Sequence, residues 1–246
     1  ANAIETQVSI ITDVSIDHTD YLGNTIDAIA REKAAIARSE IPLVISAENK
    51  ALHVIKGYAC SIGAYLCEVD DPVLYNTGMD GRHQGINAAL ALKAAEILGV
   101  RLSSGELRYA VNTAFLPGRI ESVGILPGRV ILDVAHNPAS MVSLVKYLSK
   151  IGFRGIGVLG ILKDKDYIKM AGLLRDACTK IYMAPVESKR SWQEHHMSGF
   201  IGLDGYYRFN SIRQAFDTAL RAGEDIVITG SFYSIAEVRD RVIWQG

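Results

Sequence analysis

Apolar residues in the first half of the chain follow two periods. Short runs rich in β-branched residues predict strands at residues 7–13 and 42–46. Apolar side chains that recur every three or four residues predict helices at 24–39, 49–66, 84–98 and 106–113. Asn24 or Thr25 is expected to cap the first helix, and Gly99 follows the third. The chain therefore opens as strand, loop and helix.

The second half alternates regularly between short apolar strands and helices. The strands are predicted at 129–134, 155–160, 180–184 and 225–229, and the helices at 138–151, 166–178, 212–222 and 234–243. Such alternation is typical of a doubly wound, mostly parallel α/β sheet with its ligand loops at the carboxyl ends of the strands. Residues 114–119 contain Pro117-Gly118 and form the best candidate linker, so we expect domains at 1–114 and 115–246.

Composition narrows the class of protein. The 246 residues include 26 Lys and Arg against 27 Asp and Glu, and 49% of them are hydrophobic. This balance lacks the basic footprint of a nucleic-acid-binding protein and is too apolar for a disordered chain. The apolar stretch 156–162 is far shorter than the ~18 to 20 residues that span a bilayer, and no signal peptide opens the sequence. We expect a cytoplasmic protein without nucleic-acid or membrane partners.

Two glycine patterns bear on nucleotide binding. Gly155, Gly157 and Gly160 match GxGxxG, but they lie inside a predicted strand, whereas the dinucleotide motif follows a strand and opens a helix. Close packing of the strand is the favoured interpretation, and a dinucleotide-dependent oxidoreductase is the weaker alternative. No lysine follows a glycine, so a Walker A loop is absent from this sequence.

The segment from Asp133 to Pro138 lies where a strand ends and a helix begins. A carboxylate there can accept hydrogen bonds from ribose hydroxyls, while His136 and the first N–H groups of the helix face an anion. A helix cap with a packed histidine is an equally good interpretation of the spacing alone.

A second polar cluster follows the first strand. His18 lies among carboxylates, and Lys33 lies fifteen residues later on a small, apolar helix face. A histidine with carboxylates can ligate a divalent cation, and a lysine with a lowered pKa can react with CO2 to give a carbamate ligand. The alternative is a capping aspartate and a surface lysine.

Seven short segments, taken in order, resemble the dihydrofolate synthase/folylpolyglutamate synthase family of the Mur ligase superfamily. They are SIDHTDYLG at 15–23, REKAAI at 31–36, HQGINAA at 83–89, PGR at 117–119, DVAHNP at 133–138, GILKDKD at 160–166 and TGSFY at 229–233.

The resemblance implies an ATP-dependent ligase of folate biosynthesis and one-carbon metabolism. It adds L-glutamate to dihydropteroate or to the γ-carboxylate of folates through an acyl phosphate, requires Mg²⁺ and acts as a monomer. By the same resemblance, His18 and a carbamylated Lys33 are metal-binding and catalytic residues. For ATP, the resemblance implies that Asn87 binds the adenine, Arg119 the phosphates and Asp133 the ribose. For glutamate, it implies binding by His136 and Ser231.

This sequence departs from the family pattern in two places. Ala35 stands where the family has glycine, which adds a methyl group beside Lys33. Family members also begin with a P-loop portion, so residues 1–114 resemble only the later part of the central ATPase domain, and 115–246 resemble the Rossmann-like C-terminal domain. We therefore expect an incomplete, inactive portion of a ligase, the alternative being a non-catalytic remnant that binds a nucleotide or a partner chain.

Overall fold

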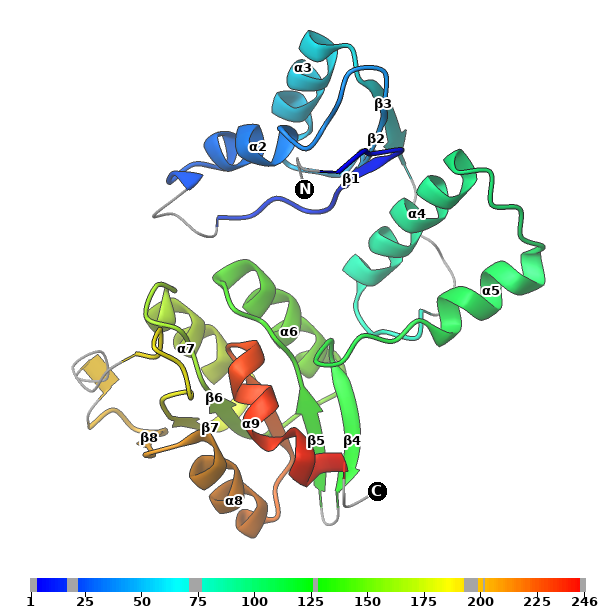
Figure 1. Ribbon diagram of the computed structural model, residues 1–246. Helices are drawn as coiled ribbons and strands as arrows, with labels where there is room; N and C mark the ends of the chain where they lie inside the picture. Colours follow the sequence, from blue (N-terminus) through cyan, green and yellow to red (C-terminus); the bar gives the residue numbers. More distant parts are fainter. Residues whose placement is uncertain are drawn as a thin grey trace. The chain divides into compact units, whose positions relative to one another are not determined.

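The computed structural model describes residues 4–16, 22–70, 77–125, 128–192, 199–200 and 202–243. The chain divides into two compact units, Ala1–Phe115 and Leu116–Gly246 (Figure 1). Each unit has its own sheet and its own buried apolar residues. None of the described helices is both long and apolar enough to cross a membrane.

Unit 1 is built on a three-stranded parallel sheet in the order β1, β2, β3. Its elements are β1 (Ser9–Ile11), α2 (Ile26–Ala34), β2 (Pro42–Ser46), α3 (Leu52–Ile62), β3 (Tyr65–Val69), α4 (Arg82–Ile97) and α5 (Ser104–Thr113). Thr25 caps α2, because its hydroxyl accepts a hydrogen bond from the N–H of Ala28 at 3.2 Å. Apolar residues of α2 and α3, including Ile29 and Ile55, are buried against the sheet.

The predicted helix at 49–66 is wrong in its second part. Helix α3 ends at Ile62, and Gly63 follows with φ at +71°, a left-handed conformation that glycine adopts without strain. Residues Tyr65–Val69 then form β3, which pairs in parallel with β2. Helical periodicity missed this strand because its pairing partner lies some twenty residues earlier in the chain.

Unit 2 is a six-stranded sheet in the order β4, β5, β9, β6, β7, β8. Among the described strands of this sheet, only the β4 and β5 pair is antiparallel. The elements are β4 (Glu121–Ile125), β5 (Gly128–Leu132), α6 (Pro138–Lys150), β6 (Gly155–Leu159), α7 (Tyr167–Arg175), β7 (Cys178–Met183), β8 (Tyr206–Arg208), α8 (Ile212–Ala222), β9 (Ile226–Thr229) and α9 (Phe232–Ile243). The predicted doubly wound, mostly parallel sheet is confirmed.

Helices cover both faces of this sheet. Buried residues of α6 and α7 pack on one face, and those of α8 and α9 pack on the other (Figure 1). Successive strand residues alternate between these two cores, as Ile226, Val227 and Ile228 do in β9. Both faces are therefore apolar, which explains why the central strands are continuous apolar runs in the sequence.

The sequence analysis did not predict β4 and β8, the two edge strands of unit 2. β4 contains the exposed Ser122 and Gly124, and β8 has only three residues, two of them exposed. Such short or half-polar segments carry little apolar signal, and their place in the sheet comes from pairing with β5 and β7.

The packing interpretation of the GxGxxG segment is confirmed. Gly155 and Gly157 lie within β6 and are fully buried. A Cβ atom at Gly155 would lie 1.9 Å from the backbone oxygen of Asp225, and one at Gly160 would lie 2.6 Å from the side chain of Ile212. These glycines let neighbouring elements pack closely and do not open a helix.

Candidate active site

Polar residues gather where the parallel strands of unit 2 end. The loops that follow β5, β9, β6 and β7 all leave the sheet at its carboxyl edge. The loops after β9 and β6 approach closely: Gly230 has φ at +108°, and a Cβ atom there would lie 2.5 Å from the backbone oxygen of Gly160. Four of the seven site residues predicted from the sequence lie at this edge or next to it. They are Arg119, Asp133, His136 and Ser231.

Asp133 lies directly after β5 with only 8% of its surface exposed. One carboxylate oxygen accepts from the N–H of Ile120 at 3.0 Å, and the other accepts from the N–H of Ala135 at 2.8 Å. Burial raises the pKa of Asp133 to about 6, against the opposing effects of these two hydrogen bonds and of the nearby charges of Arg119 and His136. At neutral pH the carboxylate is therefore mostly ionised and retains lone pairs that can accept from a hydroxyl group.

Arg119 and His136 both act electrostatically on Asp133, so the structure brings these three predicted residues together. Arg119 is half-buried, and its guanidinium carbon lies 5.9 Å from the ring centroid of Phe232, the residue after Ser231. A cation over an aromatic face is attracted by the negative face of the ring.

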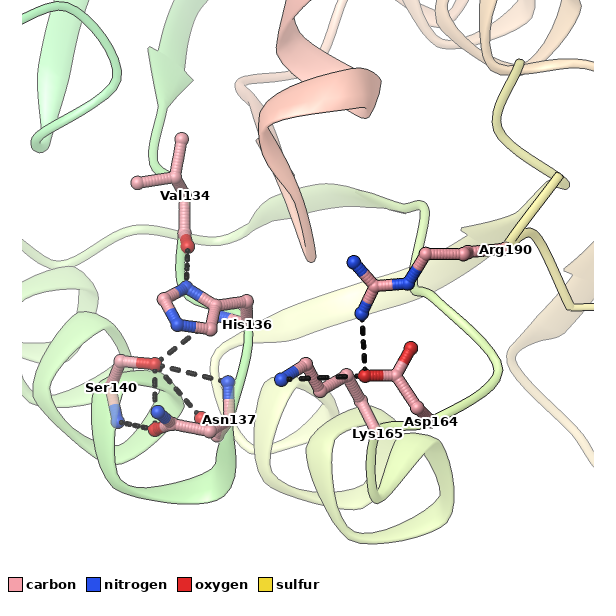
Figure 2. A network of polar contacts seen from close by, with 7 residues as sticks. All are labelled: Val134, His136, Asn137, Ser140, Asp164, Lys165 and Arg190. Atoms are coloured by element: carbon pink, nitrogen blue, oxygen red, sulfur yellow. Dashed lines mark hydrogen bonds and ion pairs between the residues drawn. The ribbon is translucent and has the colours of Figure 1, made fainter. Parts of the chain in front are cut away.

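His136 and Asn137 shape the start of α6 (Figure 2). The Nδ1 atom of His136 lies 2.9 Å from the backbone oxygen of Val134, and Asn137 forms a capping box with Ser140. The alternative from the sequence, a capped helix with a held histidine, is therefore present in the structure. It is compatible with anion binding, because a helix N-terminus also favours negative charge.

Ser231 serves as a helix cap in this structure. Its hydroxyl accepts from the N–H of Ser234 at 3.1 Å near the start of α9, and only 3% of its surface is exposed. A role in binding glutamate stays a prediction, because it requires the hydroxyl to serve a ligand in addition to this cap.

Sequence reasoning assigned no role to a charged cluster in the loops after β6 and β7. Asp164 accepts from the guanidinium of Arg190 at 2.7 Å and lies 3.6 Å from the ammonium of Lys165 (Figure 2). The side chain of Lys165 is only 4% exposed. The alternation of lysine and aspartate at 163–166, directly after a buried strand, is the sequence signal that points to this cluster.

In unit 1, the proposed metal residues are only partly described. His18 lies outside the described residues. Lys33 is exposed on α2 and borders a hollow of about 340 Å³, together with Glu32, Thr12 and apolar residues of β1 and α2. No group of three or more His, Cys, Asp or Glu side chains suitable for a metal occurs within the described ranges.

Asn87 is half-buried on α4 and donates a hydrogen bond to the buried Gln84 at 3.1 Å. This contact links two side chains one helical turn apart and fixes the orientation of the Asn87 amide. Its predicted contact with adenine is not tested by the structure and stays a prediction.

Residues 118–232 match the family model described as "Mur ligase, glutamate ligase domain". Dihydrofolate synthase/folylpolyglutamate synthase of Escherichia coli is 32% identical over 261 residues, which cover 97% of this chain and 61% of that protein. The chain thus spans about three fifths of the length of this curated relative.

Solved structures agree with this result. E. coli FolC in complex with DHPP and ADP superposes with a TM-score of 0.84 at 29% identity, over 99% of this chain and 63% of that one. A bifunctional folylpolyglutamate synthase/dihydrofolate synthase with Mn, AMPPNP and L-glutamate bound gives a TM-score of 0.85 at 28% identity. The superposition covers 98% of this chain and 63% of that one.

Proposed function

Since this chain belongs to the dihydrofolate synthase/folylpolyglutamate synthase family of Mur ligases, we propose that it serves the ATP-dependent addition of L-glutamate to dihydropteroate or to the γ-carboxylate of folates. The observation that carries the proposal is the edge of unit 2. Arg119 and His136 lie close enough to Asp133 there to affect its ionisation, inside the segment that matches a glutamate ligase domain.

The reaction joins a carboxylate to an amine, which requires activation of the carboxylate. Transfer of the terminal phosphoryl group of ATP to a carboxylate oxygen releases ADP and gives an acyl phosphate. The amine of glutamate then attacks the carbonyl carbon, so that the C–N bond forms and the C–O bond to the phosphate breaks. Inorganic phosphate leaves, and the amine loses a proton. Fixed positive charges stabilise such anionic transition states because they need no reorganisation.

Each residue of unit 2 suits one part of this reaction. The guanidinium of Arg119 would bind phosphate oxygens, and the carboxylate of Asp133 would accept from ribose hydroxyls. His136, at the N-terminus of α6, would face the carboxylate of the incoming amino acid. In unit 1, Asn87 would bind the adenine.

The residues around Lys33 are compatible with a divalent cation. Glu32 and Thr12 offer oxygen ligands beside the hollow, and hard cations such as Mg²⁺ prefer oxygen. A carbamate on Lys33 would add a further oxygen ligand. When bound, the metal would neutralise charge on the phosphates. A relative's complex contains manganese, which supports a divalent metal in general.

We further propose that this stretch of sequence does not complete the reaction alone, because no lysine follows a glycine and it therefore supplies no Walker A lysine. A cytoplasmic, monomeric ligase remains our expectation.

Isothermal titration with Mg-ATP tests the proposal, alone and with a separately expressed segment that supplies a Walker A loop. We expect ligation of glutamate to dihydropteroate only with that segment. Arg119→Met should weaken the response to ATP at least tenfold, while the exposed Arg154→Met is the matched control. Tight nucleotide binding without any ligation would favour the binding remnant, and no response to nucleotide in either case would contradict the ligase.

A further inference from the structure

The loops after β6 and β7 are tied together at Arg190. Its guanidinium donates to Asp164 at 2.7 Å, and its backbone oxygen accepts from the N–H of Lys163 at 2.9 Å. A bridge between Leu162 and Ser191 adds a backbone contact. Side chain and backbone therefore both fix where the guanidinium lies.

The cluster places one carboxylate beside two cationic side chains. Burial raises the pKa of Asp164, but the hydrogen bond from Arg190 and the charges of Lys165 and Arg190 outweigh this effect, so the pKa lies below its ordinary value. One carboxylate thus faces two cations at neutral pH, and Lys165 is almost completely buried.

Arg190 still has donors available. Its side chain is 51% exposed, and Asp164 is its one side-chain partner in the described part of the chain. A guanidinium carries five N–H donors arranged as a fork that matches a carboxylate. An exposed, oriented guanidinium at a ligand edge is well suited to bind a second carboxylate.

Strand order places Arg190 apart from the predicted ATP-binding and glutamate-binding residues of unit 2. Asp133 and His136 follow β5, Ser231 follows β9, and Arg190 follows β7, while β6 lies between β9 and β7. Neighbouring strands are about 4.8 Å apart, so β9 and β7 are separated by roughly 10 Å. A ligand that reacts near β5 or β9 would reach Arg190 only with a long substituent.

Resting on the function proposed above, we propose that Arg190 binds the side-chain carboxylate of the incoming amino acid and thereby selects a dicarboxylic one. The reacting amine and the α-carboxylate share one carbon, and two methylene groups separate this carbon from the side-chain carboxylate. The second carboxylate therefore extends along the edge toward β7, where the long arginine side chain meets it. Asp164 is a positioning residue that orients the guanidinium.

Binding of L-glutamate and L-glutamine, measured by ligand-detected NMR on the whole chain, tests this assignment. The wild type should prefer glutamate at least tenfold. Arg190→Met should weaken glutamate binding about 10- to 100-fold, the effect of losing hydrogen bonds between charged groups, and leave glutamine binding unchanged. Lys189→Met is the matched control, since Lys189 is the exposed neighbour on the same loop, and should change binding less than twofold.

Two further variants separate binding from loop stability. Arg190→Lys keeps the charge without the fork and should retain part of the preference. Asp164→Asn should reduce the preference for glutamate over glutamine, a ratio that a merely structural contact would not change. Circular dichroism would establish that each variant is folded.

The measurement is repeated with Mg²⁺, a non-hydrolysable ATP analogue and the separately expressed segment that supplies a Walker A loop, so that the two proposals can fail separately. Glutamate binding that Arg190→Met leaves intact overturns the role of Arg190 only. Glutamate binding that depends on Arg190 without any response to nucleotide supports this inference and contradicts the ligase. Absence of glutamate binding under both conditions overturns both.

Discussion

Asp133 shows how one buried carboxylate combines a structural contact with candidate chemistry. Its two oxygens hold the backbone of Ile120 and Ala135, while burial raises its pKa to about 6 from 3.8. A carboxyl group with a raised pKa in the folded state favours folding in its protonated form. Its contribution is therefore fully present below about pH 3.8 and is lost as the pH rises through 6.

The variant Asp133→Asn tests this pH dependence, because an amide does not titrate. The free energy of unfolding of the wild type, minus that of the variant, should fall by roughly 2 to 3 kcal/mol between pH 3 and pH 7. Urea unfolding at several pH values measures the difference. A difference that stays constant, or that increases with pH, would contradict the raised pKa.

At the scale of single elements, the glycines of β6 are needed for packing. Gly155→Ala would place a methyl group against the backbone of Asp225, which cannot move as a flexible side chain can. We expect a loss of about 3 kcal/mol or more, at the upper end for overpacked cores. Thermal unfolding checks this value, and an alanine tolerated without cost would show that β6 and β9 can separate.

Gly172→Ala is the matched control for that experiment. Gly172 is exposed within α7, and a Cβ atom there meets nothing within 4 Å. Alanine has the higher helix propensity, so we expect an increase in stability of about 0.5 to 1 kcal/mol.

The capping box of α5 provides a second test at this scale. The hydroxyl of Ser103 accepts from the N–H of Glu106, and the side chain of Glu106 accepts from the N–H of Ser103. Ser103→Ala should cost about 1 kcal/mol of unfolding free energy. The exposed Ser104→Ala, one residue later, lacks these contacts and should be nearly neutral in the same denaturation experiment; an equal loss in both would contradict the cap.

At the scale of the whole molecule, each unit has its own buried apolar residues. Phe216 is fully buried in unit 2, and Ile55 is fully buried in unit 1. Phe216→Ala should destabilise unit 2 by about 3 to 5 kcal/mol, and Ile55→Ala should destabilise unit 1 by about 2 to 5 kcal/mol. Hydrogen exchange followed by mass spectrometry should show faster exchange only in the unit that carries the substitution. Equal loss of protection in both units would mean that they unfold as one.

The sequence alone predicted the central strands of unit 2 and helices α6 and α8, because elements buried on both faces or capped by Asn137 and Ser211 carry strong local patterns. It also predicted that Asp133 and His136 lie at the carboxyl edge of the sheet. The resemblance to a family added Asn87, Arg119 and Ser231 and the expected roles of the site residues, which the structure leaves as predictions.

The tertiary structure decided those features that depend on contacts between residues far apart in the sequence. β3, β4 and β8 have weak or misleading local patterns and form because neighbouring strands pair with them. The raised pKa of Asp133 follows from its burial in the folded chain, where the N–H of Ile120, thirteen positions earlier, binds its carboxylate. The cluster of Asp164 and Arg190 joins residues twenty-six positions apart, which adjacent strands bring together at one edge of the sheet. Local periodicity records which face of an element is buried, whereas pairing, burial and charge clusters depend on contacts that only the folded chain makes.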